Sequence, residues 1–413
     1  MEFIIFFFLL TQVFGQTFQH PKLKNADVEP QLVVPNTYII KYKENVSTSS
    51  KKKHEEGIDK MAKTKGKEGV LDNFNLHDFK GYVADISKSE LHDIVNSDLV
   101  DYVEPDTIVN MSAITAPSLG PLTKRGYTTQ LKAPWGLARI SRSYSGEGLD
   151  PRYTYDNTAG AGINVYVLDS GIRTTHKDFG GRAIWGANFI TGSPDTDEFG
   201  HGTHVAGTIG GKTYGVAKRC KIYAVKVLDK DGIGSWSVIL QGLQWAVDHA
   251  RSHGRINKSV INASLGGGFT QIGNDVVKST TDLGMTIVVS AGNEASDAAN
   301  FSPGSAPSAI TVGATDGSDW RSMWSNYGTL VDIYAPGTDI LSAGHLSDTS
   351  SVYMSGTSMA SPHVAGLAAY FMAKDGVRGS TAVTNRILAA ADVGFIDLTS
   401  DSPQRLASNS SPK

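Results

Sequence analysis

The sequence is poor in three features that would point to particular classes of protein. Cys220 is the only cysteine among 413 residues, which excludes an internal disulfide and a cysteine-rich zinc site. Lys and Arg number 38 against 41 Asp and Glu, so the chain lacks the basic excess typical of nucleic-acid binding. Beyond Leu10, no apolar run approaches the roughly 20 residues of a membrane span. Hydrophobic residues still make up 40%, which suffices for a packed core.

The N-terminus has the pattern of an export signal. The apolar run from Phe3 to Leu10 is too short to span a membrane and fits the central region of a signal peptide. Gly15 precedes the expected cleavage point, so the signal is residues 1–15. The segment before the run carries Glu2 and no Lys or Arg, which is unusual for a signal, and a buried strand is the alternative. We expect a secreted, extracellular protein, stabilised by packing and by any bound metal.

The rest of the chain is longer than the usual ~100–200 residues of one domain. Its composition differs between a first and a second part, which indicates two domains. Charged residues are dense in the first part, whereas most of the 44 glycines lie in the second. Between them lies a segment rich in Pro, Gly and Ser that also carries Lys124 and Arg125, typical of an exposed linker where proteases cut. The expected order is a spacer (16–35), a small domain (36–110), a linker (111–127) and a large domain (128–413).

Secondary-structure patterns predict a different fold for each domain. The small domain is expected to be α+β, with strands at 37–43, 79–86 and 100–106 and helices at 51–67 and 87–95. Ser87 followed by Glu90 predicts a capping box at the second helix. The large domain is expected to be α/β, a mainly parallel sheet covered by helices on both faces. Its expected strands are 163–169, 222–228, 260–265, 286–291 and 309–314, and its helices include 237–253 and 360–374.

Two motifs of the large domain supply a carboxylate and an imidazole. Asp169 ends a buried strand, where it could orient a histidine, although an Asp that caps a turn is an equally good interpretation. His201 lies in Gly200-His201-Gly-Thr-His204, whose small residues allow close approach by substrate. The two histidines lack the four-residue spacing and the intervening Glu of a zinc-binding helix. We therefore interpret His201 as the functional imidazole and favour a structural role for His204, hydrogen-bonded at the helix start.

A third motif supplies a serine. In Ser355-Gly-Thr-Ser358-Met-Ala, a tight turn leads into an apolar helix at Ser358, where backbone N–H groups favour negative charge. Taken alone, Ser358 could be a helix cap. Together the three residues could form a catalytic serine site, in which His201 takes the proton of Ser358 and Asp169 stabilises the imidazolium. They occur in the chain order Asp, His, Ser. That order is the one found in subtilisin, and the Gly-x-Ser-x-Gly elbow of esterases is absent.

The three motifs resemble those of the subtilisin-like serine proteases. The region from Ala133-Pro-Trp-Gly-Leu-Ala-Arg-Ile-Ser onward is similar to the proteinase K branch, and the small domain resembles its inhibitor-type propeptide. The resemblance implies a broad-specificity endopeptidase, a monomer, that prefers an apolar or aromatic residue before the cut. It also implies that Asn293 and the N–H of Ser358 form the oxyanion hole. The residues that it assigns to the substrate groove are Gly232, Gly234, Trp236, Ser264, Leu265, Gly266, Ala291 and Gly292. Trp236 is expected on one rim of the groove, and plain packing is an equally good interpretation of it.

The resemblance further implies a structural calcium ion and a self-processed zymogen. Calcium would be held by Asp332 and the carbonyls of Pro307 and Ala309, and an Asp at a strand end is the alternative interpretation. The propeptide would assist folding and block the groove until it is cut. Alignment puts the mature start at Thr128, after Tyr127, with Lys124-Arg125 as a rival cut for a dibasic-specific protease.

The sequence departs from the family pattern in its cysteines. Relatives in this branch commonly have disulfides, and a cysteine where this chain has Val205. Cys220 is therefore expected to be a buried residue with no part in the chemistry.

Two alternative functions remain. One is a pseudoprotease, a binding protein on the same fold, against which the intact triad and Asn293 argue. The other is a secreted inhibitor, in which the small domain acts on another protease after its release.

Overall fold

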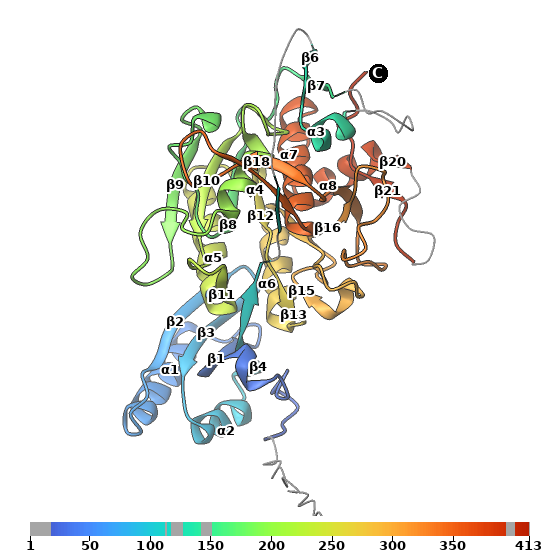
Figure 1. The fold of residues 1–413 in the computed structure, drawn as a ribbon. Coiled ribbons are helices and arrows are strands. Elements are labelled where there is room, and N and C mark those ends of the chain that lie inside the picture. Colours follow the sequence, from blue (N-terminus) through green and yellow to red (C-terminus); the bar gives the residue numbers. More distant parts are fainter. Residues whose placement is uncertain (1–17, 112–113, 117–126, 142–150, 394–400, 413) are drawn as a thin grey trace, which may run out of the picture.

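The computed structural model describes residues 18–111, 114–116, 127–141, 151–393 and 401–412. The predicted signal peptide and the basic pair Lys124-Arg125 lie outside these residues. The small domain, blue in Figure 1, lies against one end of the large domain. Among the described helices, none combines the length and the apolar character that crossing a membrane requires.

The small domain is a four-stranded antiparallel sheet with two helices, in the order βαββαβ. Its elements are β1 (Val33–Tyr42), α1 (Thr48–Lys63), β2 (Gly69–Leu76), β3 (Phe79–Asp85), α2 (Lys88–Asn96) and β4 (Val100–Asn110). The prediction missed β2, because its Asp72, Asn73 and Asn75 are poor strand formers and only pairing with β3 makes it a strand. The α+β class is correct.

Two local features anchor the small domain. The predicted capping box is present, since the backbone N–H of Ser87 donates to the Glu90 carboxylate at 2.7 Å. The described part of the expected spacer packs on the sheet, where Leu23 bridges to Val103 of β4. A 3₁₀ helix, Pro30–Leu32, then leads directly into β1.

The large domain is built on a nine-stranded sheet in the order β20-β21-β17-β16-β14-β12-β8-β10-β9. All of its neighbouring strands are parallel except β20 and β21. The strands are β8 (Asn164–Asp169), β9 (Ala183–Asn188), β10 (Lys221–Lys226), β12 (Ser259–Ala263), β14 (Thr286–Ser290), β16 (Ile310–Thr315), β17 (Ile333–Pro336), β20 (Asp392–Val393) and β21 (Arg405–Leu406).

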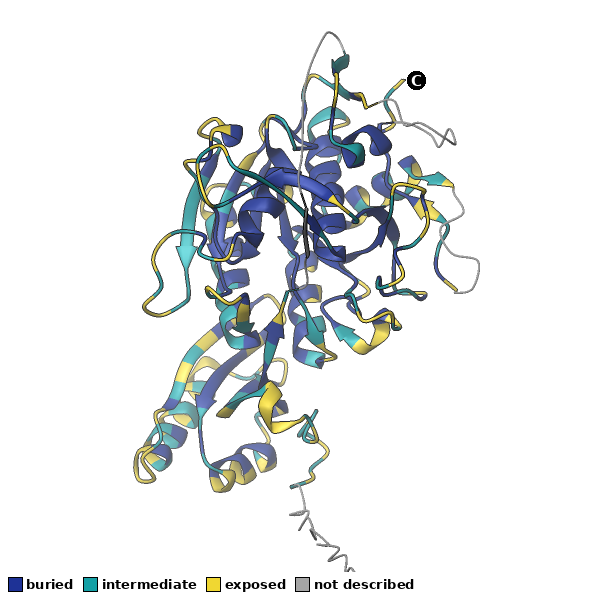
Figure 2. Ribbon diagram, in the orientation of Figure 1, coloured by how far each residue is buried: buried dark blue, intermediate teal, exposed yellow. Residues whose placement is uncertain are grey.

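Helices cover both faces of this sheet, as the sequence predicts. Val165 and Val167 of β8 face a cluster that includes α4 (His201–Gly210), α7 (Thr357–Lys374) and α8 (Ser380–Ala390). Tyr166 and Leu168 face the opposite cluster, with α5 (Trp236–Ser252) and α6 (Gln271–Asp282). Because the central strands are covered on both faces, they are almost wholly buried, as the dark blue centre of Figure 2 shows, whereas edge strand β9 is mostly half-buried.

Short elements surround the sheet and join the two domains. They are β5 (Ile114–Ala116), β6 (Tyr127–Gln130), α3 (Trp135–Ile140), β7 (Tyr153–Asp156), β11 (Ile233–Ser235), β13 (Gly267–Gly268), β15 (Phe301–Ser302), β18 (Ile340–Ala343), β19 (Ser351–Ser355) and the 3₁₀ helices Lys177–Phe179, Ile256–Lys258 and Ala298–Asn300. Strand β11 of the large domain pairs with β4 and extends the small-domain sheet to five strands. The two domains therefore share a sheet.

Candidate active site

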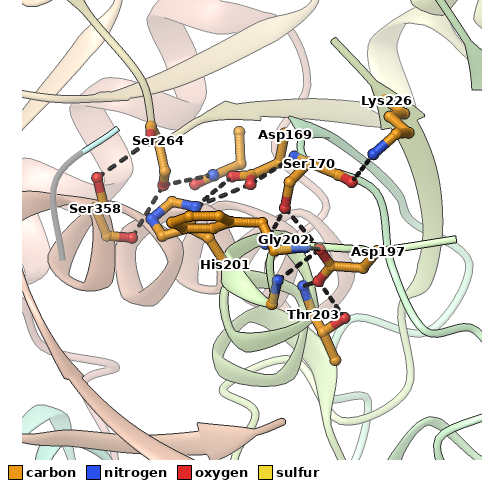
Figure 3. Close-up of polar contacts among 12 residues, drawn as sticks. Asp169, Ser170, Asp197, His201, Gly202, Thr203, Lys226, Ser264 and Ser358 are labelled. Atoms are coloured by element: carbon orange, nitrogen blue, oxygen red, sulfur yellow. Dashed lines mark hydrogen bonds and ion pairs between the residues drawn. The ribbon is translucent and has the colours of Figure 1, made fainter. Parts of the chain in front are cut away.

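Asp169 and His201 form a buried hydrogen-bonded pair at the carboxyl end of the large sheet. Asp169 is the last residue of β8, and His201 is the first residue of α4. Nδ1 of His201 lies 2.8 and 2.9 Å from the two carboxylate oxygens of Asp169, and both residues are fully buried (Figure 3). A carboxylate at Nδ1 fixes the tautomer in which Nε2 can accept a proton.

The small residues around His201 are needed for this close approach. Gly200 has φ 104°, and a Cβ there would lie 2.2 Å from Nδ1 of His345. A Cβ on Gly202 would lie 2.0 Å from the carbonyl oxygen of Gly171, in the loop that follows β8. The start of α4 can therefore pack against the end of β8 and its following loop only with glycine at 202, whereas glycine at 200 leaves room for the ring of His345.

Ser358 lies in the first turn of α7 and faces the same site. Its hydroxyl donates to the carbonyl oxygen of Ser264 at 3.1 Å, and the hydroxyl of Ser264 donates to the carbonyl oxygen of Ser358 at 3.0 Å. Nε2 of His201 has no hydrogen-bond partner among the described residues. The serine–imidazole hydrogen bond is thus not formed in this structure, and such contacts commonly tighten only when substrate is bound.

Asn293 is held by the residue that precedes Ser358. Its Oδ1 accepts hydrogen bonds from the backbone N–H of Thr357 at 2.8 Å and from the Thr357 hydroxyl at 2.9 Å. Because Oδ1 accepts from Thr357 at the start of α7, the NH₂ group of Asn293 is the end of the amide that can donate. The N–H of Ser358, in the same first turn, makes no hydrogen bond within the described part of the chain.

A buried carboxylate that the sequence analysis missed organises the surroundings of His201. Asp197 accepts hydrogen bonds from the Ser170 hydroxyl at 2.8 Å and from the backbone of Gly200 at 2.7 Å and Thr203 at 2.8 Å (Figure 3). It thereby ties the residue after Asp169 to the start of α4. An Asp a few residues before a helix start is a common capping signal, which could have drawn attention to it.

Lys226 extends this network beneath the site. Its Nζ is fully buried and donates to the carbonyl oxygen of Ser170 at 2.7 Å. It also lies 3.5 Å from the Glu198 carboxylate. The ammonium group therefore fixes the backbone immediately after Asp169.

His204 has a structural position, with a partner other than the expected one. Its Nε2 donates to the carbonyl oxygen of Ile340 on β18 at 2.8 Å, rather than to a group at the helix start. Complete burial lowers the pKa of His204 to about 3, so the ring is neutral. In the described residues no three His, Cys, Asp or Glu side chains gather as metal ligands.

The predicted groove residues flank a strand of the chain itself. Asn110, at the end of β4, exchanges two backbone hydrogen bonds of 3.0 Å with Gly266. On its other edge, β4 pairs with β11, where Val109 lies opposite Gly234. A cavity beyond this strand is lined by residues from both sides, among them Asn110, Met111, Leu265, Gly266, Ala291, Gly292, Asn293 and Ser358. The geometry is that of an extended peptide inserted between two edges.

Two further groove predictions have different outcomes. Met111 lies over Gly232, because a Cβ added to Gly232 would be 3.0 Å from Cγ of Met111. Trp236 is 2% exposed and opens α5 inside the apolar cluster that also contains Val109. Trp236 therefore packs beneath the groove, as the packing interpretation predicts, rather than standing on its rim.

The comparisons with known proteins agree with this geometry. The Subtilase family model matches residues 160–404. The chain belongs to the subtilase family. The Peptidase inhibitor I9 model matches residues 37–112, so this subtilase carries an inhibitor propeptide as its small domain.

Relatives of this subtilase match over most of their length. "Alkaline protease 1" of Aspergillus clavatus is 44% identical over 91% of this chain and 92% of its own. "Subtilisin-like serine protease AsES" of Sarocladium strictum is 44% identical over 92% of this chain and 91% of its own. A crystal structure of a cold-adapted subtilisin-like serine proteinase is 38% identical, with a TM-score of 0.63 over 68% of this chain and all of that one. This chain is accordingly a subtilisin-like serine peptidase.

The propeptide of the subtilase also caps two helices of the peptidase domain. The Glu104 carboxylate accepts from the backbone N–H groups of Gln271 at 3.1 Å and Ile272 at 3.0 Å, at the start of α6. The Asp106 carboxylate accepts from the backbone and the hydroxyl of Ser237 at the start of α5. Burial raises the pKa of Glu104 to about 7 and also raises the pKa of Asp106.

The three residues predicted as calcium ligands line one cavity. Pro307, Ala309 and Asp332 lie together beside Thr281 and Asp282. Oδ2 of Asp332 accepts from the Thr311 backbone at 2.9 Å, and burial raises the pKa of Asp332 to about 6. A carboxylate with backbone carbonyls is an oxygen-only donor set, which suits Ca²⁺.

Cys220 lacks the exposure and the low pKa of a reactive thiol. It is fully buried in the apolar cluster on the α4 side of the sheet. Burial raises the pKa of the Cys220 thiol to about 12, so the thiolate is scarce at neutral pH. The expectation of a buried side chain is confirmed.

Proposed function

We propose that this subtilase is a secreted serine endopeptidase of broad specificity, made as a zymogen that cuts itself. The observation that carries the proposal is the buried Asp169–His201 pair at the strand ends, with Ser358 at the start of α7 beside it. The names of the relatives, which include an alkaline protease and subtilisin-like proteases, support peptidase activity. Export is supported by the apolar run near the N-terminus.

The proposed mechanism uses each group of the site once in each half-reaction. Ser358 Oγ attacks the carbonyl carbon while Nε2 of His201 takes its proton, and Asp169 stabilises the resulting imidazolium. The NH₂ group of Asn293 and the N–H of Ser358 donate to the developing oxyanion. His201 returns the proton to the leaving amine, and water then releases the acyl group by the same steps in reverse.

Broad specificity follows from how the groove would hold a peptide. The strand β4 pairs through its main chain with Gly234 and Gly266, so recognition depends little on sequence. Val109 is fully buried in an apolar cluster, which supports an apolar preference at that position of a substrate. We extend the preference to an apolar or aromatic residue before the cut.

A structural calcium ion is part of the proposal. Asp332 and the carbonyl oxygens of Pro307 and Ala309 would hold it, and the proposal is supported because these three residues line one cavity and offer oxygen ligands. The ion would stabilise the fold and take no part in the chemistry. We propose further that the enzyme acts on protein substrates as a monomer, with its propeptide as its own inhibitor.

The activity is tested with a peptide substrate and a reagent that labels nucleophilic serines. Wild type is expected to hydrolyse the substrate and to be labelled at Ser358. Ser358→Ala should lose both properties, with a residual rate at least about 10³-fold lower. Ser318→Ala, at an exposed serine of the same domain, is the matched control. Inactive wild type that retains the fold would favour the pseudoprotease.

A further inference from the structure

The segment that precedes β1 is folded onto the small domain, although it lies before the residues that match the inhibitor family. Its described part is residues 18–32, whereas the inhibitor match begins at residue 37. Phe18 and Leu23 pack against the apolar cluster of the small domain, to which Val103 of β4 belongs. The segment is therefore a structured part of the propeptide and more than a spacer.

Backbone hydrogen bonds fix this segment against one edge of β4. The N–H of Val103 donates to the carbonyl oxygen of Lys22 at 2.8 Å, and the N–H of Lys24 donates to the carbonyl oxygen of Val103 at 2.9 Å. Val103 thus directs both of its backbone groups to the segment, which lies at the edge of β4 opposite β1. The Lys22 ammonium also donates to the carbonyl oxygen of Ser97 at 2.6 Å. These contacts bring the next residue, Asn25, to Glu104 of β4.

Asn25 connects the segment to the peptidase domain. Its NH₂ group donates to the Glu104 carboxylate at 3.2 Å and to the carbonyl oxygen of Phe269 at 2.9 Å. The same oxygen of Glu104 accepts from the backbone N–H of Gln271 at the start of α6. Because an amide nitrogen carries two donor hydrogens, one side chain serves an acceptor from each domain. Asn25 has φ 49°, a left-handed conformation that Asn tolerates better than most residues.

The segment and the peptidase domain also share the wall of a cavity. Val28 and Leu32 line it from the segment, and Phe269 and Phe301 line it from the peptidase. Leu32 is 44% exposed and Phe269 is 42% exposed, so more than half of each is covered. Removal of the segment would uncover apolar surface here, which water disfavours. The apolar contact therefore adds to the hydrogen bonds of Asn25 in holding the segment in place.

We propose that residues 18–32 are part of the inhibitor, and that Asn25 slows release of the cut propeptide by bridging Glu104 and the carbonyl oxygen of Phe269. The inference rests on the proposed function, in which the propeptide inhibits the peptidase. It assigns a second binding surface on the peptidase, formed by the Phe269 carbonyl with the side chains of Phe269 and Phe301, whose partner is the N-terminal segment of the same chain. Because Asn25 acts on the docked propeptide and not on the reacting bond, it should change release and leave cutting unaffected.

The proposal is tested on the full chain by measuring self-cleavage, from fragment masses, and the later appearance of activity as two separate rates. Asn25→Gly removes both hydrogen bonds and keeps the left-handed backbone accessible. It should leave the cleavage rate unchanged and speed the appearance of activity about tenfold. Asn36→Gly, at an exposed residue of the same domain with φ 62°, should behave like wild type. Equal release rates for Asn25→Gly and wild type would overturn the bridge.

Asn25→Asp tests whether residue 25 faces Glu104 in the complex. Its carboxylate would meet the Glu104 carboxylate and the carbonyl oxygen of Phe269, both of which are acceptors, without a hydrogen to donate. At pH 8 this variant should release its propeptide faster than Asn25→Gly, because repulsion between carboxylates is added to the loss of the hydrogen bonds. Slower release than in Asn25→Gly would contradict the contact with Glu104.

The pairing with β4 gives an independent test. Lys24→Pro removes the N–H that donates to Val103 and should also speed release, whereas Lys24→Ala retains it and should not. Equal release in these two variants would contradict the docking on β4.

Hydrogen exchange of the full-length Ser358→Ala chain decides if the position-24 variants fail to fold. The amide hydrogens of Lys24 and Val103 should be protected. Exchange of the Lys24 amide at the rate of an unstructured peptide would refute the docked segment. An inactive wild type together with a protected Lys24 amide would instead reject the proposed function and retain the docked segment.

Discussion

The hydroxyl of Ser170 donates to the carboxylate of Asp197 across a distance of 2.8 Å. Ser170 follows Asp169 in the chain, and Asp197 also holds the backbone of Gly200, which precedes His201. One buried carboxylate therefore joins the two chain segments that carry Asp169 and His201. Its position makes Asp197 a positioning residue that acts through its neighbours.

Asp197→Asn is expected to lower kcat by about 10- to 100-fold with little change in KM, because small misplacements of a catalytic group are costly. The pH–rate profile should also shift, which a purely structural role would not cause. Steady-state kinetics across pH check this. Asp195→Asn, an exposed neighbour, is the control. A lower melting temperature with unchanged kcat would assign Asp197 to stability alone.

Asn293→Leu is expected to lower kcat by about 10²–10³-fold while KM stays close to that of wild type, the size of effect found for an oxyanion-hole donor in subtilisin. Thr357→Val removes the hydroxyl that holds Oδ1 and should cost less, since the Thr357 N–H remains. Initial-rate kinetics of both variants test the assignment. A rise in KM at constant kcat would instead place Asn293 in ground-state binding.

The sequence predicts the buried sheet well and the contacts between distant segments poorly. Strands β8, β10, β12, β14 and β16 fall within two residues of their predicted ends, because strands covered on both faces are continuous apolar runs. The motifs around Asp169, His201 and Ser358 stand out because small residues surround them. By contrast, β2 contains Asp72 and Asn73, and only its tertiary pairing makes it a strand.

Interactions between distant segments explain the other misses. The role of Asp197 depends on Ser170, whose proximity no local pattern reveals. The family resemblance puts Trp236 on a groove rim, yet its ring packs against α6, where a Cβ on Gly273 would meet it at 2.6 Å. The pairing of β4 with β11 joins two domains, and periodicity within one segment carries no information about such partners.

Removal of calcium is expected to lower the melting temperature of the mature enzyme by about 5–10 °C, for an ion present at about 100 times its Kd. Asp332→Asn should abolish this dependence, and Asp248→Asn, exposed on α5, should preserve it. Burial raises the pKa of Asp332 to about 6 in the folded protein. Since calcium binds the ionised form, the effect of a chelator should grow as pH rises from about 5 to 7. Unchanged melting in chelator at pH 7 would contradict the site.

Release of the cut propeptide is expected to depend on Glu104. Burial raises the pKa of Glu104 to about 7 in the complex, well above its ordinary value. The complex therefore takes up a proton as it forms, so its stability is fullest at low pH and falls as pH rises through 7. Activity should appear about 10- to 100-fold faster at pH 8 than at pH 5, measured after self-cleavage and corrected for the pH dependence of the free enzyme.

Glu104→Gln, which mimics the protonated side chain, tests this pH dependence. The amide oxygen of Gln can still accept from one of the N–H groups of Gln271 and Ile272, which donate to different carboxylate oxygens in wild type, so part of the cap is retained without its charge. The variant should release its propeptide slowly at pH 8, which flattens the dependence on pH. Glu68→Gln, an exposed position in the same domain, should behave like wild type. A steep profile in Glu104→Gln would assign the dependence to other groups, of which Asp106 at the start of α5 is the first to examine.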